Sequence, residues 1–266
     1  MYILGAAQSM SSRARKEARP DGDPRRLLVN SEAGIEIACD LYLKEDSARA
    51  FLIVPGFWRH RRHPAIAELA ARLRDSGSVA AMDIRGHGES GGRFGFNRDE
   101  HLDVAAVARE ILSLTGASRL DMIGFSMGGA IAATAAARHP ELPWGKIMLI
   151  SPVGNLGRLR PRLNPLTAHR HLAVGQIFRT PRFDWGFWFH TKIQAEDEIA
   201  KVDVPVTIVH VRRDWLVDDS HGSRLHERCR NSKLHLLEVP GRWHADRILT
   251  EVPEAIEPAI REFLEG

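Results

Sequence analysis

Short apolar runs alternate with longer amphipathic segments over most of the chain. Within the runs, apolar side chains follow one another without regular polar alternation, which is typical of strands covered on both faces. Such runs lie at 51–54, 79–82, 120–123, 147–150 and 206–211, and a last strand is expected at 235–239. Strands of this kind separated by helical segments predict an α/β fold with a mostly parallel sheet and helices on both faces.

The first two strands are expected to differ from the others. Residues 26–30 and 35–43 flank a turn that ends at Gly34. Every second residue from Ile35 to Leu43 is apolar, and these residues alternate strictly with Glu36, Ala38, Asp40 and Tyr42. This pattern favours an antiparallel hairpin at one edge of the sheet. With this hairpin the sheet has about eight strands.

Helices are expected in the intervals between the strands. Pro64 stands where a first helical residue would, Asn97 with Glu100 resembles a capping box, and Gly116 is expected to end the helix that follows. The predicted helices are 65–73, 102–114, 128–138 and 252–264.

Two segments do not fit this alternation of strands and helices. Residues 1–26 carry six basic and three acidic side chains, which accounts for the whole formal net charge of +3. We therefore expect residues 1–25 to form a flexible basic arm. Residues 153–202 are rich in arginine, histidine and aromatic residues and too long for a simple connection, so we interpret them as an inserted, mainly helical lid. Residues 26–152 and 203–266 then form the core.

Composition excludes several classes of protein. The chain has 266 residues, 44% of them hydrophobic and 27% charged, as a globular protein does. No segment approaches the roughly 20 apolar residues of a membrane span, and the opening residues lack the basic lead of a secretory signal, so we expect a cytoplasmic protein without stable membrane insertion. Two cysteines provide neither a disulfide framework nor a thiolate zinc site. Because residues 27–266 are formally neutral, no nucleic-acid partner is expected.

The most specific chemical signal is a G-x-S-x-G motif, Gly124-Phe125-Ser126-Met127-Gly128, between an apolar run and a helical segment. The glycines permit a sharp turn from strand to helix, which lifts the serine hydroxyl above the edge of the sheet. The first amides of the helix then lie beneath the serine, where the amide of Met127 could stabilise an oxyanion. Ser126 is therefore the candidate nucleophile.

A nucleophilic serine needs a base and an acid that orients the base, and both follow along the chain. Asp214 comes just after the strand at 206–211, and His244 comes just after the last strand, so both are expected at the same edge of the sheet as Ser126. Asp218 and Asp219 compete for the role of the acid, although capping of the next helix explains them better.

A second oxyanion donor is expected after an early strand. Gly56, in Pro55-Gly56-Phe57-Trp58, allows the chain to turn so that the amide of Phe57 faces the same point as that of Met127. A simple turn at the end of a strand explains this sequence equally well.

Taken together, these residues resemble the α/β-hydrolase superfamily from Arg26 to Gly266. Besides the G-x-S-x-G motif, the segment Asp83-Ile84-Arg85-Gly86-His87-Gly88-Glu89-Ser90 is similar to the D-x-R-G-x-G-x-S turn of that superfamily. The continuation Gly91-Gly92-Arg93-Phe94, with Asp103 at the start of the next helix, resembles bacterial serine esterases, monoacylglycerol lipases and lysophospholipase-like hydrolases.

The resemblance implies an α/β-hydrolase fold and a serine hydrolase that needs no cofactor and no metal. The roles it implies are nucleophile for Ser126, acid for Asp214, base for His244, and oxyanion hole for the amides of Phe57 and Met127. It also implies a structural role for His87. Many relatives have His-Gly where this chain has Pro55-Gly56, which removes a histidine that often supports this loop.

The substrate is less defined than the chemistry. Trp58, Phe178, Trp185, Trp188 and Trp215 are candidates for the wall of an apolar substrate pocket, although packing of the lid on the core explains aromatic residues equally well. Two basic clusters, at 59–63 and 158–171, either bind an acidic group of the substrate or are solvated surface charges.

We expect hydrolysis of small-molecule carboxylic esters with small to medium apolar acyl groups through an acyl-enzyme. A thioesterase, an amidase of the serine aminopeptidase type and a C–C bond hydrolase use the same three residues and remain alternatives. A ligand receptor without turnover is a further alternative from another class. The sequence predicts no oligomeric state.

Overall fold

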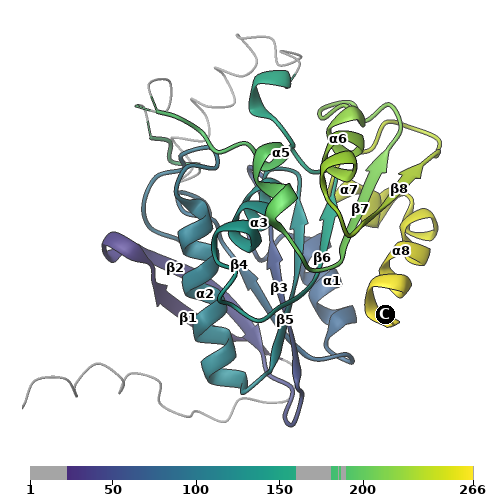
Figure 1. Cartoon of the computed structure of the whole chain (residues 1–266). Coiled ribbons are helices and arrows are strands. Elements are labelled where there is room, and N and C mark those ends of the chain that lie inside the picture. Colours follow the sequence, from purple (N-terminus) through teal and green to yellow (C-terminus); the bar gives the residue numbers. More distant parts are fainter. Residues whose placement is uncertain (1–22, 160–180, 185, 187–189, 266) are drawn as a thin grey trace, which may run out of the picture.

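The computed structural model describes residues 23–159, 181–184, 186 and 190–265. Eight strands form one sheet in the order β1-β2-β4-β3-β5-β6-β7-β8 (Figure 1). Their bounds are β1 Arg25–Asn30, β2 Glu36–Tyr42, β3 Arg49–Val54, β4 Ser78–Met82, β5 Arg119–Phe125, β6 Trp144–Ile150, β7 Val206–Val211 and β8 Ser232–Leu237. The predicted α/β architecture with about eight strands is confirmed.

The helices lie in the intervals that the sequence indicated. The α-helices are α1 Pro64–Leu73, α2 Glu100–Thr115, α3 Met127–Arg138, α5 Ala195–Glu198, α6 Ser220–Arg228, α7 Arg247–Glu251 and α8 Pro253–Glu265. Short 3₁₀ turns lie at η1 Glu32–Gly34, η2 Leu156–Arg158 and η4 Ile199–Lys201. Pro64 is the first residue of α1, as predicted.

The expected hairpin forms one edge of the sheet. β1 pairs antiparallel with β2, with Asn30 opposite Glu36, and β2 pairs antiparallel with β4. All pairs from β4 to β8 are parallel. The carboxyl ends of β3 to β8 therefore share one edge, and the segments that follow these strands can meet there.

Helices cover the sheet on both faces, with a separate apolar core on each side (Figure 1). Successive residues of a central strand enter different cores: Leu52 packs on the side of α2 and α3, and Ile53 on the side of α1 and α8. Because side chains alternate across a strand, a strand buried on both faces must be apolar at every position. This explains the runs without polar alternation.

The ends of several elements differ from the prediction. The capping box at Asn97 is wrong, because α2 begins at Glu100 with Asp99 at its N-cap. The side-chain amide of Asn97 instead donates to Thr134 Oγ1 and to the Ile193 carbonyl, each at 2.9 Å. β8 begins three residues earlier than expected. Gly116 does end α2, in the left-handed conformation at φ 66° that glycine tolerates.

The insertion lies between β6 and β7, as expected. Its described parts are η2, a short bridge between Phe94 and Phe183, and the turns of α5 and η4 just before β7. Residues 160–180, 185 and 187–189 lie outside the described residues, so a mainly helical lid stays a prediction. The same holds for the basic arm, of which only 23–25 are described, and Arg25 already belongs to β1.

Phe263 tests how strongly α8 is held on the sheet. Its side chain is 1% exposed, and its ring lies 6.5 Å from that of Phe51. We expect Phe263→Ala to lower the free energy of unfolding by about 3–5 kcal/mol, because it removes buried apolar contacts and leaves a cavity. Leu28→Ala, at a half-exposed position of β1, is the matched control and should change it by no more than about 0.5 kcal/mol. Urea unfolding measures both, and equal effects would contradict this assignment of the core.

Candidate functional site

The G-x-S-x-G segment forms a tight turn from β5 into α3. Ser126 stands between the two elements at φ 51° and ψ −115°, a backbone conformation that is strained for a residue with a side chain. A side chain at Gly128 would overlap the carbonyl oxygens of Val54 and Pro55, so only glycine lets α3 begin so close to the end of β3. The turn therefore places Ser126 at the carboxyl edge of the sheet.

The three residues expected to act together do lie together. His244 Nε2 is 2.8 Å from Ser126 Oγ, and His244 Nδ1 is 2.7 Å from Asp214 Oδ2. All three are buried, with 8%, 8% and 4% of His244, Ser126 and Asp214 exposed. With the Nδ1 proton donated to Asp214, Nε2 is left to accept from the serine hydroxyl. The arrangement can remove a proton from Ser126 and hold the resulting positive charge.

Asp214 is fixed by the turn that follows β7. Its Oδ1 accepts hydrogen bonds from the amides of Leu216 and Val217, at 2.8 and 3.1 Å. His210, in β7, lies near this carboxylate. Its Nε2 is 3.8 Å from Asp214 Oδ2 and 3.0 Å from the Val217 carbonyl oxygen. Burial lowers the pKa of His210, which keeps that ring neutral beside the acid.

The two competing aspartates lie at the start of α6. Asp218 Oδ1 accepts the amide of Ser220 at 3.2 Å, and Asp219 stands at the N-cap of the helix, 3.8 Å from Arg212. No hydrogen bond to His244 is among their contacts with the described residues. Asp219 thus holds the N-cap position, although its side chain makes no capping hydrogen bond.

The loop after β3, residues 55–63 and here called the β3 loop, runs directly against Ser126. A Cβ atom at Gly56 would lie 3.2 Å from Ser126 Cβ and 3.1 Å from the Phe125 carbonyl oxygen. Within the described residues, neither the amide of Phe57 nor that of Met127 donates a hydrogen bond. Two unused amides on segments that pack against each other beside a serine suit the binding of an oxyanion.

The ring of Phe57 lies at the centre of an aromatic cluster that the sequence did not reveal. Its centroid is within 4.7 to 5.7 Å of those of Trp58, His87, Phe94, Phe96 and Phe183. These residues come from the β3 loop, the segment after β4 and the insertion. No local spacing could have indicated that they meet, because three separate segments supply them.

The predicted pocket residues have different outcomes. Trp58 contacts the ring of Phe57, and Trp215 is 44% exposed beside Asp214. Phe183, from the same aromatic-rich stretch as the other candidates, is buried in the cluster. Phe178, Trp185 and Trp188 lie outside the described residues.

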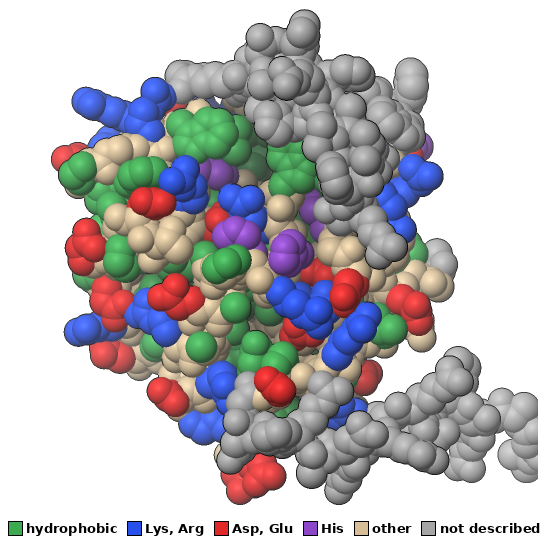
Figure 2. Space-filling view, turned by 180° about the vertical axis from the view of Figure 1, so that it is seen from behind, with side chains coloured by type: hydrophobic (Ala, Val, Ile, Leu, Met, Phe, Trp, Pro, Cys, Tyr) green, Lys and Arg blue, Asp and Glu red, His purple; other side chains and the backbone are tan. Residues whose placement is uncertain are grey.

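The first basic cluster, within the β3 loop, is neutralised by the protein's own carboxylates. Arg59 Nε lies 3.0 Å from Asp246 Oδ2, and Arg62 Nε lies 2.9 Å from Asp40 Oδ2. Arg61 is buried among carboxylates. Figure 2 likewise shows acidic and basic side chains interspersed over one face of the molecule. This pairing favours a structural role over the binding of an acidic substrate.

The second basic cluster is described only at its beginning. Arg158 pairs with Glu196 at 2.8 Å, which ties η2 to α5. Arg160, Arg162, His169, Arg170 and His171 lie outside the described residues.

His87 is buried in the segment after β4 rather than presented to Ser126. Its Nδ1 lies 3.2 Å from the Arg85 carbonyl oxygen, and its Nε2 has no hydrogen-bond partner among the described residues. Its ring meets those of Phe57 and Phe94 edge to face. Burial lowers the pKa of His87 to about 4, so the ring is neutral at pH 7.

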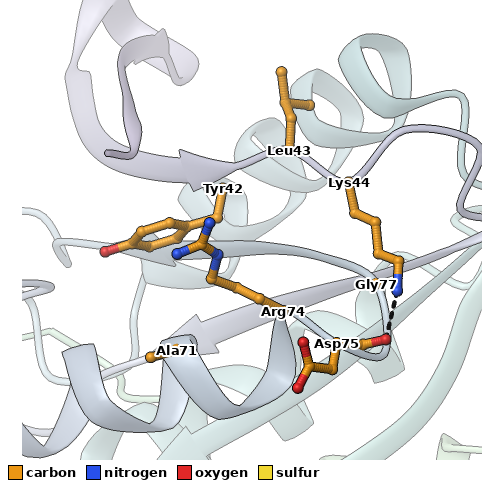
Figure 3. Close-up of a pocket in the computed structure, with 7 residues that line it drawn as sticks. All are labelled: Tyr42, Leu43, Lys44, Ala71, Arg74, Asp75 and Gly77. Carbon is orange, nitrogen blue, oxygen red and sulfur yellow. Dashed lines mark hydrogen bonds between the residues drawn. The ribbon is translucent and has the colours of Figure 1, made fainter. Parts of the chain in front are cut away.

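Elsewhere among the described residues, the candidate sites carry no comparable chemistry. A hollow of about 340 Å³ is lined by Tyr42, Leu43, Lys44, Ala71, Arg74, Asp75 and Gly77 (Figure 3). It lies at the amino end of β4, whereas Ser126 follows the carboxyl end of β5. In the described part of the chain, no three His, Cys, Asp or Glu side chains gather as metal ligands would, and no helix has the length and apolarity to cross a membrane.

The known proteins that this chain is similar to are hydrolases, in agreement with the geometry of the site. The profile of the family described as serine aminopeptidase, S33, matches residues 45–183, about half of the chain. A pimeloyl-[acyl-carrier protein] methyl ester esterase of Neisseria meningitidis is 25% identical over 83% of this chain and 95% of its own length. A monoacylglycerol lipase of Mycolicibacterium smegmatis is 24% identical over 79% of this chain and 86% of its own.

The fold is shared with solved structures. An esterase of Pyrococcus furiosus superposes with a TM-score of 0.71 at 20% identity, covering 91% of this chain and 92% of that one. The matched profile ends before β7, so Asp214 and His244 are placed by the structure and not by the profile.

The buried His87 should leave a mark on the pH dependence of stability. An unfolded histidine titrates near 6.5, whereas burial lowers the pKa of His87 to about 4, so the unfolded chain binds more protons between these values. This contribution to stability is complete above about pH 6.5 and is lost as the pH falls toward 4.

We therefore expect the free energy of unfolding of His87→Gln to fall less steeply between pH 7 and 5 than that of the wild type. His60→Gln, at an exposed position of the β3 loop, is the matched control. Urea unfolding at pH 7, 6 and 5 measures the slopes. The same slope for His87→Gln and the wild type would show that His87 is not held neutral.

Proposed function

Because the chain belongs to the serine aminopeptidase S33 family of α/β hydrolases, we propose that it hydrolyses carboxylic esters through an acyl-enzyme on Ser126. The observation that carries the proposal is the pair of hydrogen bonds that joins Ser126 through His244 to Asp214. A serine hydroxyl is a weak nucleophile unless a base removes its proton as it attacks. His244 is at hydrogen-bonding distance for this transfer.

Acylation begins when Ser126 Oγ attacks the ester carbonyl carbon and its proton passes to His244 Nε2. The Asp214 carboxylate stabilises the imidazolium that forms. The negative charge on the former carbonyl oxygen is received by the amides of Phe57 and Met127. His244 then gives its proton to the leaving alcohol, the ester C–O bond breaks, and the acyl group stays on Ser126.

Deacylation repeats these steps with water as the nucleophile. His244 takes a proton from a water molecule while the water oxygen attacks the acyl carbon. The bond to Ser126 Oγ then breaks, the serine recovers its proton from His244, and the carboxylic acid leaves. The serine, histidine and aspartate return to their starting protonation states, so the cycle needs no cofactor.

The acyl group is proposed to be small to medium in size and apolar. Aromatic side chains surround Phe57, beside the position where the ester carbonyl would bind, and apolar walls with few polar points are usual in small-molecule pockets. The insertion, residues 153–202, is proposed as the lid of this site, since Phe183, in its described part, packs on Phe57.

Esters are favoured over the alternatives by the comparisons. Two of the relatives are a methyl ester esterase and a monoacylglycerol lipase by name. The same three residues can also cleave thioesters, amides and C–C bonds, so these reactions stay alternatives. The family description itself names an aminopeptidase, which cleaves amides. A complete Ser126, His244 and Asp214 arrangement argues against a receptor without turnover.

Ser126→Ala should abolish turnover, because the nucleophile is lost while a small side chain keeps the turn intact. The measurement is hydrolysis of p-nitrophenyl esters from acetate to long acyl chains by the wild type and the variant. A matched ester, thioester and anilide series in the same assay separates the alternatives. Turnover by Ser126→Ala would exclude the acyl-enzyme, and a strong preference for the thioester or anilide would exclude the ester assignment.

Asp214→Asn should leave folding nearly unchanged and lower kcat by about 10³–10⁴-fold, since an amide disturbs the imidazole tautomer and lacks the charge. Asp218→Asn, at the start of α6, is the matched control and should retain wild-type kcat. Steady-state kinetics on the best ester of the panel measures both. An inactive Asp218→Asn variant beside an active Asp214→Asn variant would show that Asp218, and not Asp214, is the acid.

A further inference from the structure

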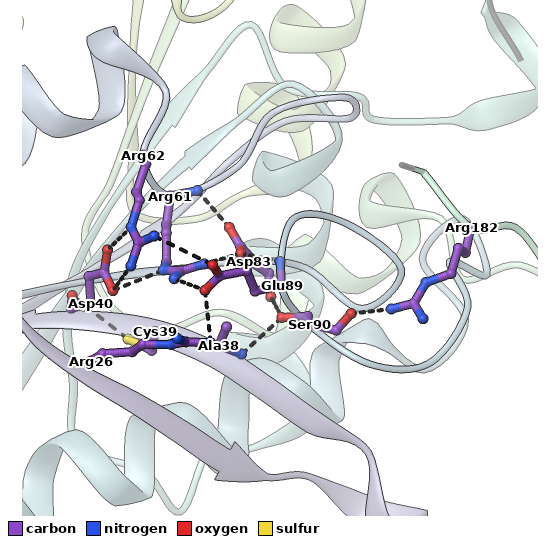
Figure 4. Close-up of polar contacts among 10 residues, drawn as sticks. All are labelled: Arg26, Ala38, Cys39, Asp40, Arg61, Arg62, Asp83, Glu89, Ser90 and Arg182. Carbon is purple, nitrogen blue, oxygen red and sulfur yellow. Dashed lines mark hydrogen bonds and ion pairs between the residues drawn. The ribbon is translucent and has the colours of Figure 1, made fainter. Parts of the chain in front are cut away.

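Arg61 is the most deeply buried cation of the β3 loop. Its side chain is 2% exposed and forms ion pairs with three carboxylates, those of Asp40, Asp83 and Glu89 (Figure 4). Its Nε lies 3.0 Å from Asp40 Oδ1, although that N–H is not aligned for a hydrogen bond. Burial of a guanidinium is costly, and it is tolerated where several carboxylates surround the charge.

Asp83 receives donors from two different segments. Its Oδ1 accepts the backbone amide of Arg61 at 2.7 Å, while its Oδ2 accepts the amide of Glu89 at 2.9 Å and also binds the Arg61 guanidinium. A side chain at Gly88 would overlap this carboxylate, so the turn wraps tightly around it. One fully buried carboxylate thus joins the β3 loop to the turn after β4, residues 83–92, here called the β4 turn.

The β4 turn is itself fixed to the rest of the fold, so it can serve as an anchor. Ser90 Oγ donates to the Asp83 carbonyl at 2.7 Å and accepts the amide of Ala38 in β2 at 2.9 Å (Figure 4). Arg85 forms two hydrogen bonds with Asp103 of α2, at 2.6 and 2.7 Å. Asp83 is therefore held in place by hydrogen bonds that connect its turn to β2 and α2.

The first two residues of the β3 loop offer few groups that could form hydrogen bonds. Pro55 has no N–H, and a side chain is absent at Gly56. The amide of Arg59 donates to the Gly56 carbonyl at 3.0 Å, which closes a tight turn around Phe57. Arg61 stands two residues beyond this turn and binds Asp83, while Arg59, at the end of the turn, binds Asp246 at 3.0 Å.

We propose that Arg61 is a positioning residue for the oxyanion hole. Its amide and guanidinium hold the β3 loop on Asp83, so that the Phe57 N–H is fixed beside Ser126. The inference rests on the proposed function, because it assigns Arg61 to the chemistry of that same site. A donor that is displaced or mobile stabilises the transition state less than a fixed donor does.

Arg49 provides a matched control at the other end of the same strand. It begins β3, whereas Arg61 follows it, and its Nε binds the buried carboxylate of Asp121 at 2.5 Å. It also donates to the carbonyls of Phe263 and Leu264 at the end of α8. Arg49→Lys thus removes a mostly buried guanidinium at the edge of the sheet opposite Ser126.

The experiment compares Arg61→Lys with Arg49→Lys in p-nitrophenyl ester hydrolysis and thermal unfolding. Lysine keeps the charge and loses the planar fork, so both variants should have a lower Tm. Only Arg61→Lys should lower kcat, by about 10–100-fold, which is less than the loss seen when an oxyanion donor is removed outright. Its KM should change by less than about threefold, because the substrate ground state does not use the oxyanion contact.

The affinity for a trifluoromethyl ketone inhibitor is a measurement that a loss of stability alone does not change. Ser126 Oγ adds to the carbonyl carbon of the ketone as its proton passes to His244, and the negatively charged hemiketal oxygen occupies the oxyanion position. The affinity of Arg61→Lys for this inhibitor should fall in parallel with kcat/KM, and that of Arg49→Lys should equal the wild-type affinity. Wild-type kcat and inhibitor affinity in Arg61→Lys, or equal losses of kcat in both variants, would overturn the proposal.

Glu89→Ala keeps the proposal testable if Arg61→Lys does not fold. The Glu89 side chain is 40% exposed, and its removal leaves Arg61 bound to Asp40 and Asp83. We expect a smaller loss of kcat, about two- to fivefold, with the same parallel loss of inhibitor affinity. An unchanged kcat in Glu89→Ala would then overturn the inference. Turnover by Ser126→Ala would instead overturn the proposed function, which separates the two failures.

Discussion

The close approach of α3 to the end of β3 is the constraint on which the rest of the site depends. Gly128 lies against the carbonyl oxygens of Val54 and Pro55, where no side chain fits. This contact brings the start of α3, with Ser126 before it, onto the first residues of the β3 loop. The segments after β7 and β8 then reach the serine from the other side, because parallel strands end at the same edge of the sheet.

Much of this arrangement could be predicted from the sequence. Strands buried on both faces are apolar throughout, and the order of serine, aspartate and histidine along the chain follows from the order of the strands that carry them. The structure brings Ser126, Asp214 and His244 within hydrogen-bonding distance, although their catalytic roles stay proposals. The assignment of the chain to the α/β hydrolases is confirmed by the family match.

The sequence could not reveal contacts between segments that are distant along the chain. Asn97 has the composition of a helix cap, yet its amide is used by Thr134 and Ile193, which only the folded chain brings near. Residues 59–63 have the composition of a solvated basic surface, whereas Arg61 lies inside the protein among carboxylates from β2 and the β4 turn. Local composition indicates which charges are present and cannot indicate how they are paired.

The described part of the insertion is held by backbone hydrogen bonds of two kinds. The amide of Glu196 donates to the Gly154 carbonyl at 2.9 Å, which joins the two ends of the insertion to each other, and the amide of Phe94 donates to the Arg182 carbonyl at 2.8 Å, which joins the insertion to the core. Because these bonds join backbone atoms, they do not depend on which side chains stand at positions 182 and 196, so these anchors can persist while the sequence at those positions changes.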